Sequence, residues 1–161
     1  MTNNISVERM SYDNTKHVRI LKACLEKWFK EPKDLNLTSP SLSYPFNFNK
    51  WVNYAYNNSD TVTYVLKKDN WIIGHISLKI RMEKQLVHIF HVFVDKSQRG
   101  KGYSKLLIKQ GIDWAKNKKF SSITLGVSPK NQIAINLYKS LGFSVTGFNK
   151  SGSLKMKLEL I

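Results

Sequence analysis

Residues 94–107 of this chain, VDKSQRGKGYSKLL, join an apolar stretch to a helical pattern and could bind an anion. The segment contains two glycines, Gly100 and Gly102, and four basic residues. Backbone N–H groups at a helix start have no intrahelical partner, and glycine lets the backbone approach a ligand closely. A basic corner of this kind is typical of a phosphate site. A plain glycine-rich turn is the structural alternative.

Three common motifs do not fit this corner. Nothing around the two glycines matches G-x-x-x-x-G-K-[ST], and Lys105 stands where G-x-G-x-x-G needs its third glycine. The strand-like residues before Arg99 argue against a helix-turn-helix.

The remaining sequence predicts an α/β fold, in which a mixed sheet carries helices. Strands are expected at 5–11, 61–68, 71–80, 85–94, 121–127, 143–148 and 154–160, and helices at 15–30, 49–58, 106–114 and 131–143. Asn14 is the expected cap of the first helix, and Gly142 ends the last. The Pro- and Ser-rich residues 31–48 predict a loop. A helix between 85–94 and 121–127 requires those two strands to be parallel, with a right-handed crossover.

Composition narrows the class of protein. A length of 161 residues predicts one domain, residues 1–161. One cysteine, Cys24, rules out an intrachain disulfide and a cysteine-based metal site. No apolar run approaches the ~20 residues that span a bilayer, and MTNNISVERM lacks a signal-peptide pattern, so we expect a cytoplasmic protein with no membrane contact.

The formal net charge is +15, and residues 95–161 hold 13 Lys and Arg against 3 Asp and Glu. Such a surface attracts anions, whether a polyphosphate cofactor or nucleic acid. A solvated lysine-rich surface without a ligand is the simpler explanation.

A second motif identifies a family. Residues 131–143, NQIAINLYKSLGF, have the spacing N-x-x-A-x-x-L-Y-x-x-x-G-F. With the R99-x-x-G102-x-S104 corner before it, this stretch resembles the GNAT superfamily of N-acetyltransferases, whose loop reads [Q/R]-x-x-G-x-[G/A]. Ser104 departs from that pattern, but its side chain is small. The resemblance implies a mostly antiparallel twisted sheet whose parallel strands, 85–94 and 121–127, splay apart.

The resemblance also implies acetyl-CoA as the cosubstrate and a reaction that needs no metal ion. Its pyrophosphate would lie on the backbone amides of Arg99, Gly100, Lys101, Gly102, Tyr103, Ser104 and Lys105. Its pantetheine arm would bond like an extra strand to Val92, Phe93 and Val94, and Asn131 would contact the arm.

Catalytic roles follow from the same resemblance. Tyr138 matches the tyrosine that protonates the departing thiolate. The glutamate base of some members falls at Gly126 and is missing. His88 is the preferred base, because histidine titrates near neutrality. His91 should point to the opposite face unless a bulge intervenes. A water chain or bulk base is a third possibility.

The acceptor is expected between the first two helices, 31–58, and on the last hairpin, 143–157. Few carboxylates occur there, so we expect a small or aromatic amine, an amino acid, an acidic peptide or a nucleotide-linked amine rather than a polycation. Three alternatives stay open: an acyl-CoA sensor without catalysis, a nucleic-acid-binding module, and an acetyltransferase for RNA or a ribosomal protein. The family often forms homodimers.

Overall fold

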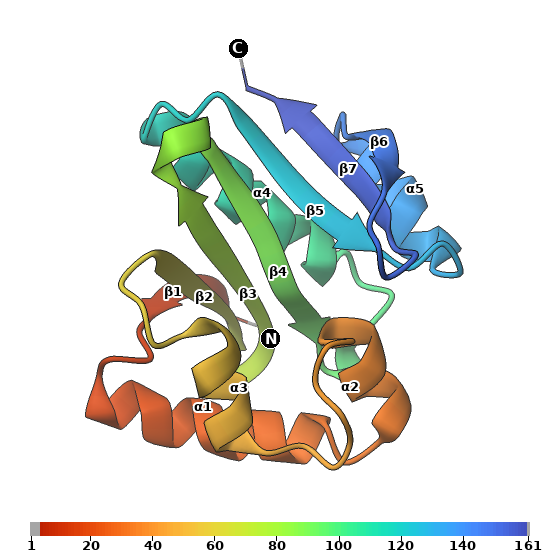
Figure 1. Cartoon of the computed structure of the whole chain (residues 1–161). Coiled ribbons are helices and arrows are strands. Elements are labelled where there is room, and N and C mark those ends of the chain that lie inside the picture. The colour runs from red at the N-terminus through yellow and green to blue at the C-terminus, as the bar shows by residue number, and fades with distance from the viewer. Residues whose placement is uncertain (1–3, 161) are drawn as a thin grey trace.

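The chain folds into one seven-stranded sheet with five helices, as seen in a computed structural model that describes residues 4–160 (Figure 1). The strands are β1 Ile5–Met10, β2 Thr61–Lys68, β3 Trp71–Arg81, β4 Leu86–Val94, β5 Ser122–Val127, β6 Ser144–Phe148 and β7 Leu154–Glu159. The helices are α1 Thr15–Trp28, α2 Pro32–Thr38, α3 Phe48–Ala55, α4 Tyr103–Asn117 and α5 Gln132–Ser140, with short 3₁₀ turns η1 Met82–Lys84 and η2 Lys96–Gln98.

The strand order is β1-β2-β3-β4-β5-β7-β6. Only β4 and β5 run parallel, and α4 connects them, as the sequence predicted. All other neighbouring strands are antiparallel. The predicted α/β mixed sheet with one parallel pair is therefore confirmed.

Helices cover both faces of the sheet, but unequally. Leu107 and Ile108 of α4 are fully buried in the cluster that also contains Ile76 of β3. On the other face, Phe29 and Trp51 belong to an aromatic cluster with Phe93 of β4. In Figure 1, α1, α2 and α3 lie in front of one end of the strands, and no helix stands in front of the other end of β5 and β7.

Short-range signals in the sequence define most helix ends. The Asn14 side chain accepts hydrogen bonds from the N–H groups of Lys16 and His17, which caps α1. Gly142 follows α5 with a φ of 100°, a left-handed conformation that glycine adopts without strain. Both features were predicted.

One local prediction was wrong. Residues 31–48 are not all loop, because α2 occupies Pro32–Thr38, with proline at the first turn where its missing N–H costs nothing. The residues of β4 alternate between buried and partly buried positions from Leu86 to Phe93. Of its partly buried residues, Phe90 packs against the aromatic cluster and Val92 packs against the cluster that contains α4.

Candidate active site

β4 and β5 separate halfway along their length. Their pairing runs from Leu86 opposite Ser122 to Ile89 opposite Leu125. Beyond Ile89, β4 pairs only with β3, so among the described residues its other edge has no strand partner. This open edge includes the predicted contacts Val92, Phe93 and Val94. An extended amide-containing chain could bond there as an added strand.

The bulge in β4 lies at His91. Ser77 is opposite Phe90 and His75 is opposite Phe93, so one β3 residue faces two residues of β4. His91 has a φ of 51°, which is rare for a residue with a side chain. The bulge turns the His91 side chain toward Tyr56 and Ser39, on the helix-covered face. The condition under which His91 could share a face with His88 is therefore met.

The β4–α4 corner presents free backbone donors. Gly100 and Gly102 both have a φ of 80°, and a Cβ built on either would meet nothing within 4 Å. Glycine is therefore required at both positions by conformation rather than by crowding. The first hydrogen bond of α4 runs from the N–H of Leu106 to the carbonyl of Gly102. No side chain caps α4 and no acidic residue occupies its first turn, so the N–H groups of its first turn can receive an anion.

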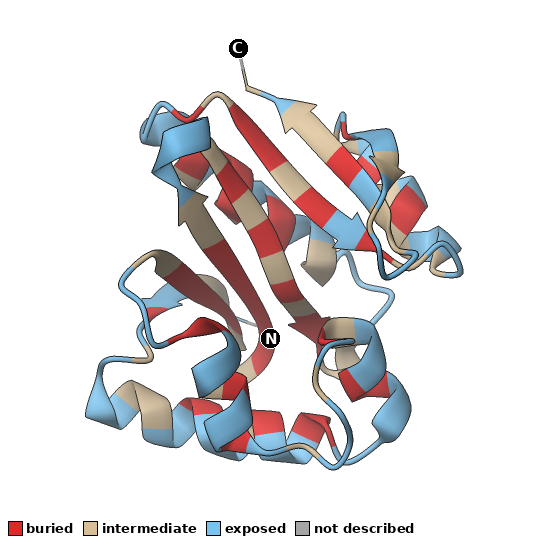
Figure 2. Cartoon of the chain, in the orientation of Figure 1, coloured by how far each residue is buried: buried red, intermediate tan, exposed pale blue. Residues whose placement is uncertain are grey.

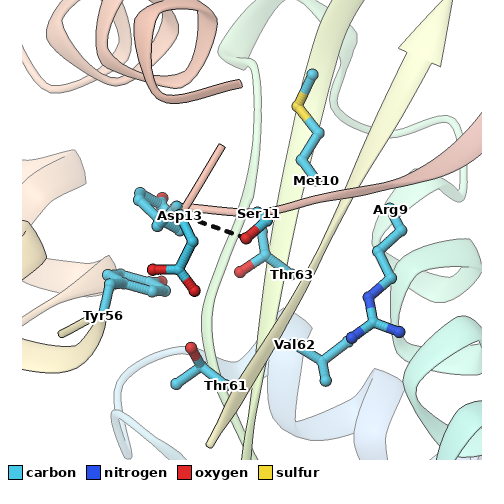
Figure 3. A pocket seen from close by; sticks show the side chains of 9 residues that line it. Arg9, Met10, Ser11, Asp13, Tyr56, Thr61, Val62 and Thr63 are labelled. Carbon is cyan, nitrogen blue, oxygen red and sulfur yellow. Dashed lines mark hydrogen bonds between the residues drawn. The ribbon is translucent and has the colours of Figure 1, made fainter. Parts of the chain in front are cut away.

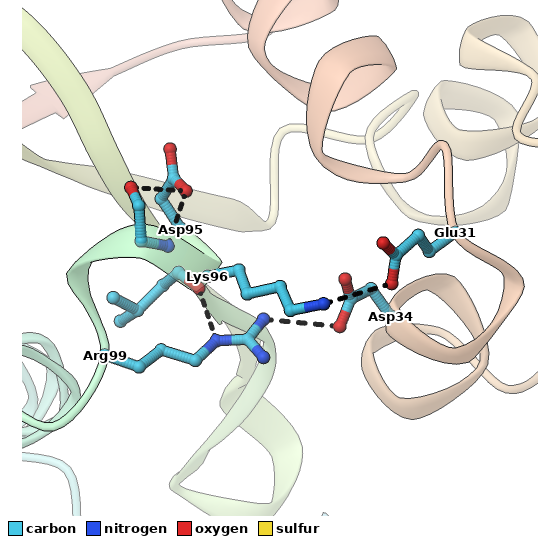
Figure 4. Close-up of polar contacts among 7 residues, drawn as sticks. Glu31, Asp34, Asp95, Lys96 and Arg99 are labelled. Atoms are coloured by element: carbon cyan, nitrogen blue, oxygen red, sulfur yellow. Dashed lines mark hydrogen bonds and ion pairs between the residues drawn. The ribbon is translucent and has the colours of Figure 1, made fainter.

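The Arg99 side chain points away from these donors, toward α2 (Figure 4). Its Nε donates to the carbonyl of Val94 at 2.9 Å, and its Nη2 lies 3.3 Å from Oδ1 of Asp34. The guanidinium also lies 5.0 Å from the centre of the Phe93 ring. A second pair, Lys96 with Glu31 at 3.5 Å, joins the same two segments. Arg99 therefore links the corner to the expected acceptor segment.

Tyr138 and Asn131 are both on α5 or at its start. The Asn131 side-chain oxygen accepts from the N–H of Ala134 at 3.2 Å and so caps the helix. Tyr138 shares a buried cluster with Val94 and Val127, the last residues of the two splayed strands. Burial raises the pKa of the Tyr138 phenol to about 12, so it stays protonated at neutral pH. Its hydroxyl is neither sealed from solvent nor bonded to any residue in 4–160.

His88 and His91 differ in how free their rings are. Nδ1 of His88 lies 2.8 Å from Oγ1 of Thr124, and its Nε2 has no partner among the described residues. Burial, followed by the nearby Arg81 charge, lowers the pKa of His88 to about 4. Both ring nitrogens of His91 are engaged, Nδ1 with the Tyr56 hydroxyl at 2.8 Å and Nε2 with Ser39 Oγ at 3.0 Å. Of these two histidines, only His88 has a ring nitrogen, Nε2, without a partner among the described residues.

A buried polar network beneath the bulge was not predicted. The Tyr56 hydroxyl contacts Ser77 Oγ at 2.7 Å, which contacts Thr63 Oγ1 at 2.9 Å. His75 joins it, with Nδ1 2.7 Å from the carbonyl oxygen of His91 and Nε2 2.9 Å from the Tyr12 hydroxyl. The polar residues inside the apolar strand 71–80 were the available signal, but their partners are distant in sequence.

The network borders a small pocket at the β1–α1 corner (Figure 3). Tyr56 and Thr63 line it together with Asp13 and Arg9, and its volume of about 40 Å³ could hold one or a few waters. The network therefore borders a polar surface pocket as well as the bulge.

No helix in residues 4–160 is long and apolar enough to cross a membrane. No group of three or more His, Cys, Asp and Glu side chains in that range could hold a metal ion.

Known proteins resemble this chain in sequence and in fold. Human N-acetyltransferase 8B is 38% identical over 65 residues, which are 40% of this chain and 28% of that protein. The N-acetylaspartate synthetase of Xenopus tropicalis is 33% identical over 76 residues, 47% of this chain and 28% of that protein. This chain thus spans less than a third of the length of either relative.

The fold matches over nearly the whole chain. A crystal structure of spermidine N-acetyltransferase from Vibrio cholerae, in complex with CoA and spermine, superposes with a TM-score of 0.77 at 15% identity. The match covers 97% of this chain and 95% of that one. The sequence profile of the acetyltransferase (GNAT) family matches residues 22–143, three quarters of the chain. The chain therefore belongs to the GNAT family of acetyltransferases.

Proposed function

We propose that this chain transfers an acetyl group from acetyl-CoA to a primary amine of a small molecule or peptide, acting as one domain over residues 1–161. The observation that carries the proposal is the open edge of β4 after Ile89, which leads directly into the uncapped start of α4. That sequence of backbone groups suits an amide-containing arm followed by a pyrophosphate. The spermidine N-acetyltransferase structure was determined with CoA and spermine, which supports a CoA donor and an amine acceptor.

The backbone would hold the donor. Acetyl-CoA supplies an activated acyl group on sulfur, and this chain supplies its position. The N–H groups of Tyr103, Ser104 and Lys105 face outward at the start of α4 and would bind the pyrophosphate. Lys101 and Lys105 are exposed beside them and add positive charge. Val92, Phe93 and Val94 would bond to the arm along their open edge.

His88 would take the proton from the attacking amine. A pKa of about 4 leaves its ring neutral at pH 7, and Nε2 can accept a proton in the tautomer whose Nδ1–H donates to Thr124. So weak a base suits a late transfer, after the amine nitrogen has begun to bond to the carbonyl carbon and has become more acidic. A water chain to bulk solvent remains the alternative route. His91 is the less suitable base, because both of its ring nitrogens are already bonded.

Tyr138 would complete the reaction. The amine nitrogen bonds to the carbonyl carbon in a tetrahedral intermediate, and the carbon–sulfur bond then breaks. The thiolate that leaves takes the phenolic proton, which burial keeps on Tyr138 at neutral pH.

Release of CoA thiol with a panel of amines tests this function. The panel would contain amino acids, arylalkylamines, polyamines and short peptides, assayed with wild type and Tyr138→Phe. We expect release that depends on the acceptor and falls by about 10²-fold in the variant. Thiol release that is equal in wild type and variant would refute the role of Tyr138. Acetyl-CoA binding without release for any acceptor would refute the enzyme and favour an acyl-CoA sensor.

A further inference from the structure

The sheet face beside His88 carries three lysine side chains, Lys79, Lys155 and Lys157. Lys79 of β3, His88 of β4, Thr124 of β5 and Lys157 of β7 are successive register partners, so they lie side by side on one face. Lys155 is opposite Gly126 on the same face, at the point where β5 leaves β4. Figure 2 shows no helix in front of this part of β5 and β7.

The charge of this face is positive even after its ion pairs are counted. Lys79 pairs with Asp60 at 3.4 Å and Lys157 with Glu159 at 3.2 Å. All four side chains are 23–65% exposed, so these pairs bind weakly and a ligand can compete with them. Lys155 forms no ion pair with any carboxylate in residues 4–160.

We propose that the acceptor is an amino acid, with acidic amino acids preferred, whose carboxylates are bound by Lys155 and Lys157 while its amine lies beside His88. This inference rests on the proposed acetyl transfer and names the substrate class of that site. A polycationic acceptor would be repelled by the same side chains.

The spacing of the strands fits such a ligand. Lys155 is one strand away from Gly126, about 4.8 Å, and Lys157 is two residues further along β7, about 6.8 Å. Lysine side chains are long and flexible enough to cover both distances. Two carboxylates separated by a few bonds can therefore reach both ammonium groups from one position.

Gly126 has the Asn149 and Ser153 side chains close above it. It has no side chain, is exposed, and a Cβ there would approach the Asn149 amide nitrogen to 3.3 Å. Asn149 is held by Ser153 Oγ at 2.7 Å and comes from the β6–β7 turn. The position therefore presents an amide donor and two lysines to an incoming carboxylate, and no carboxylate of β5 opposes it.

The test compares acceptors that differ in charge. Purified protein with acetyl-CoA would be assayed with L-aspartate, L-phenylalanine, L-phenylalaninamide and spermidine. We expect kcat/KM to decrease in that order. In Lys155→Gln and Lys157→Gln, kcat/KM for aspartate should fall roughly tenfold, mainly through KM. Phenylalaninamide should be unaffected, Lys155→Arg should retain activity, and Lys116→Gln on α4 is the control.

A second readout is independent of turnover. Calorimetry would measure L-aspartate binding to the CoA-loaded protein, which Lys155→Gln should weaken and added salt should weaken further. Acetylation of phenylalaninamide or spermidine as efficient as that of aspartate would overturn this inference and leave the proposed function standing. Aspartate binding without acetylation of any amine would refute the function but support the anion site. Neither binding nor acetylation would refute both.

Discussion

Replacing Asp34 with asparagine should loosen the connection between α2 and the β4–α4 corner. Oδ1 of Asp34 lies 3.3 Å from Nη2 of Arg99, whose Nε is already fixed by the Val94 carbonyl. Asparagine keeps the shape and one acceptor but removes the charge. A charge-assisted hydrogen bond contributes about 1.5–3 kcal/mol when buried.

The exposure of the pair reduces that value. The Asp34 side chain is only 11% exposed, but the Arg99 side chain is 44% exposed and partly solvated. We therefore expect a loss of about 1 kcal/mol in the free energy of unfolding, or a decrease in Tm of roughly 2–4 °C for a chain of this size. Because α2 lies within the expected acceptor segment, residues 31–58, the KM for the acceptor should rise more than kcat falls.

The chain contains a matched control for this experiment. Glu31 and Lys96 join the same two segments at 3.5 Å, but their side chains are 60% and 69% exposed. Glu31→Gln should leave both Tm and KM close to wild type, because exposed pairs contribute little. Thermal unfolding and acceptor titrations would be measured for both variants. Equal effects of the two substitutions, or no effect of Asp34→Asn, would refute the idea that the buried carboxylate positions α2.

Two further predictions concern His88 and the β4–α4 corner. The His88 pKa of about 4 lies below the ordinary 6.5, so the unfolded state binds the proton more readily, and stability should be lost as pH falls from 6.5 through 4. His88→Gln should reduce the loss in free energy of unfolding between pH 7 and pH 4 by about 3 kcal/mol. Denaturant unfolding at the two pH values would measure this difference. A pH dependence that is unchanged in the variant would contradict the burial argument. Gly102→Ala should cost about 1–2 kcal/mol and weaken CoA binding, because alanine must adopt a φ of 80°. Gly102→Asn should cost less, and equal CoA affinity in all three proteins by calorimetry would show that the conformation of the corner is unimportant.

Local signals in the sequence predicted the glycine corner between β4 and α4 and the start of α5. The glycines at 100 and 102 and the asparagine at 131 define a corner and a helix start through conformation and capping, which involve only neighbouring residues. The parallel pair followed from the single helix between β4 and β5. These features depend on chain geometry over a few residues, so no tertiary contact was needed to predict them.

The structure of the expected acceptor segment, residues 31–58, depends on contacts between residues that are distant in sequence. α2 was missed because residues 31–48 look like a loop, whereas Leu35 is buried against an aromatic cluster drawn from α1, α3 and β4. The network was missed because Tyr12 and His75 are 63 residues apart. The alternation of residues along a strand indicates that a bulge would turn the His91 side chain to the other face. It does not indicate whether a bulge is present.

The bulge explains how these two parts of the site depend on each other. A left-handed residue with a side chain costs about 1–2 kcal/mol, so His91 must be held by its surroundings. Its ring stacks on Trp51 at 3.8 Å and bonds to Tyr56 and Ser39, while its carbonyl accepts from His75. Those partners come from α3, from β3 and from the segments that follow α2 and α3. The buried aromatic and polar residues around His91 therefore stabilise the bend of β4. The proposed acetyl-CoA edge opens beside this bend.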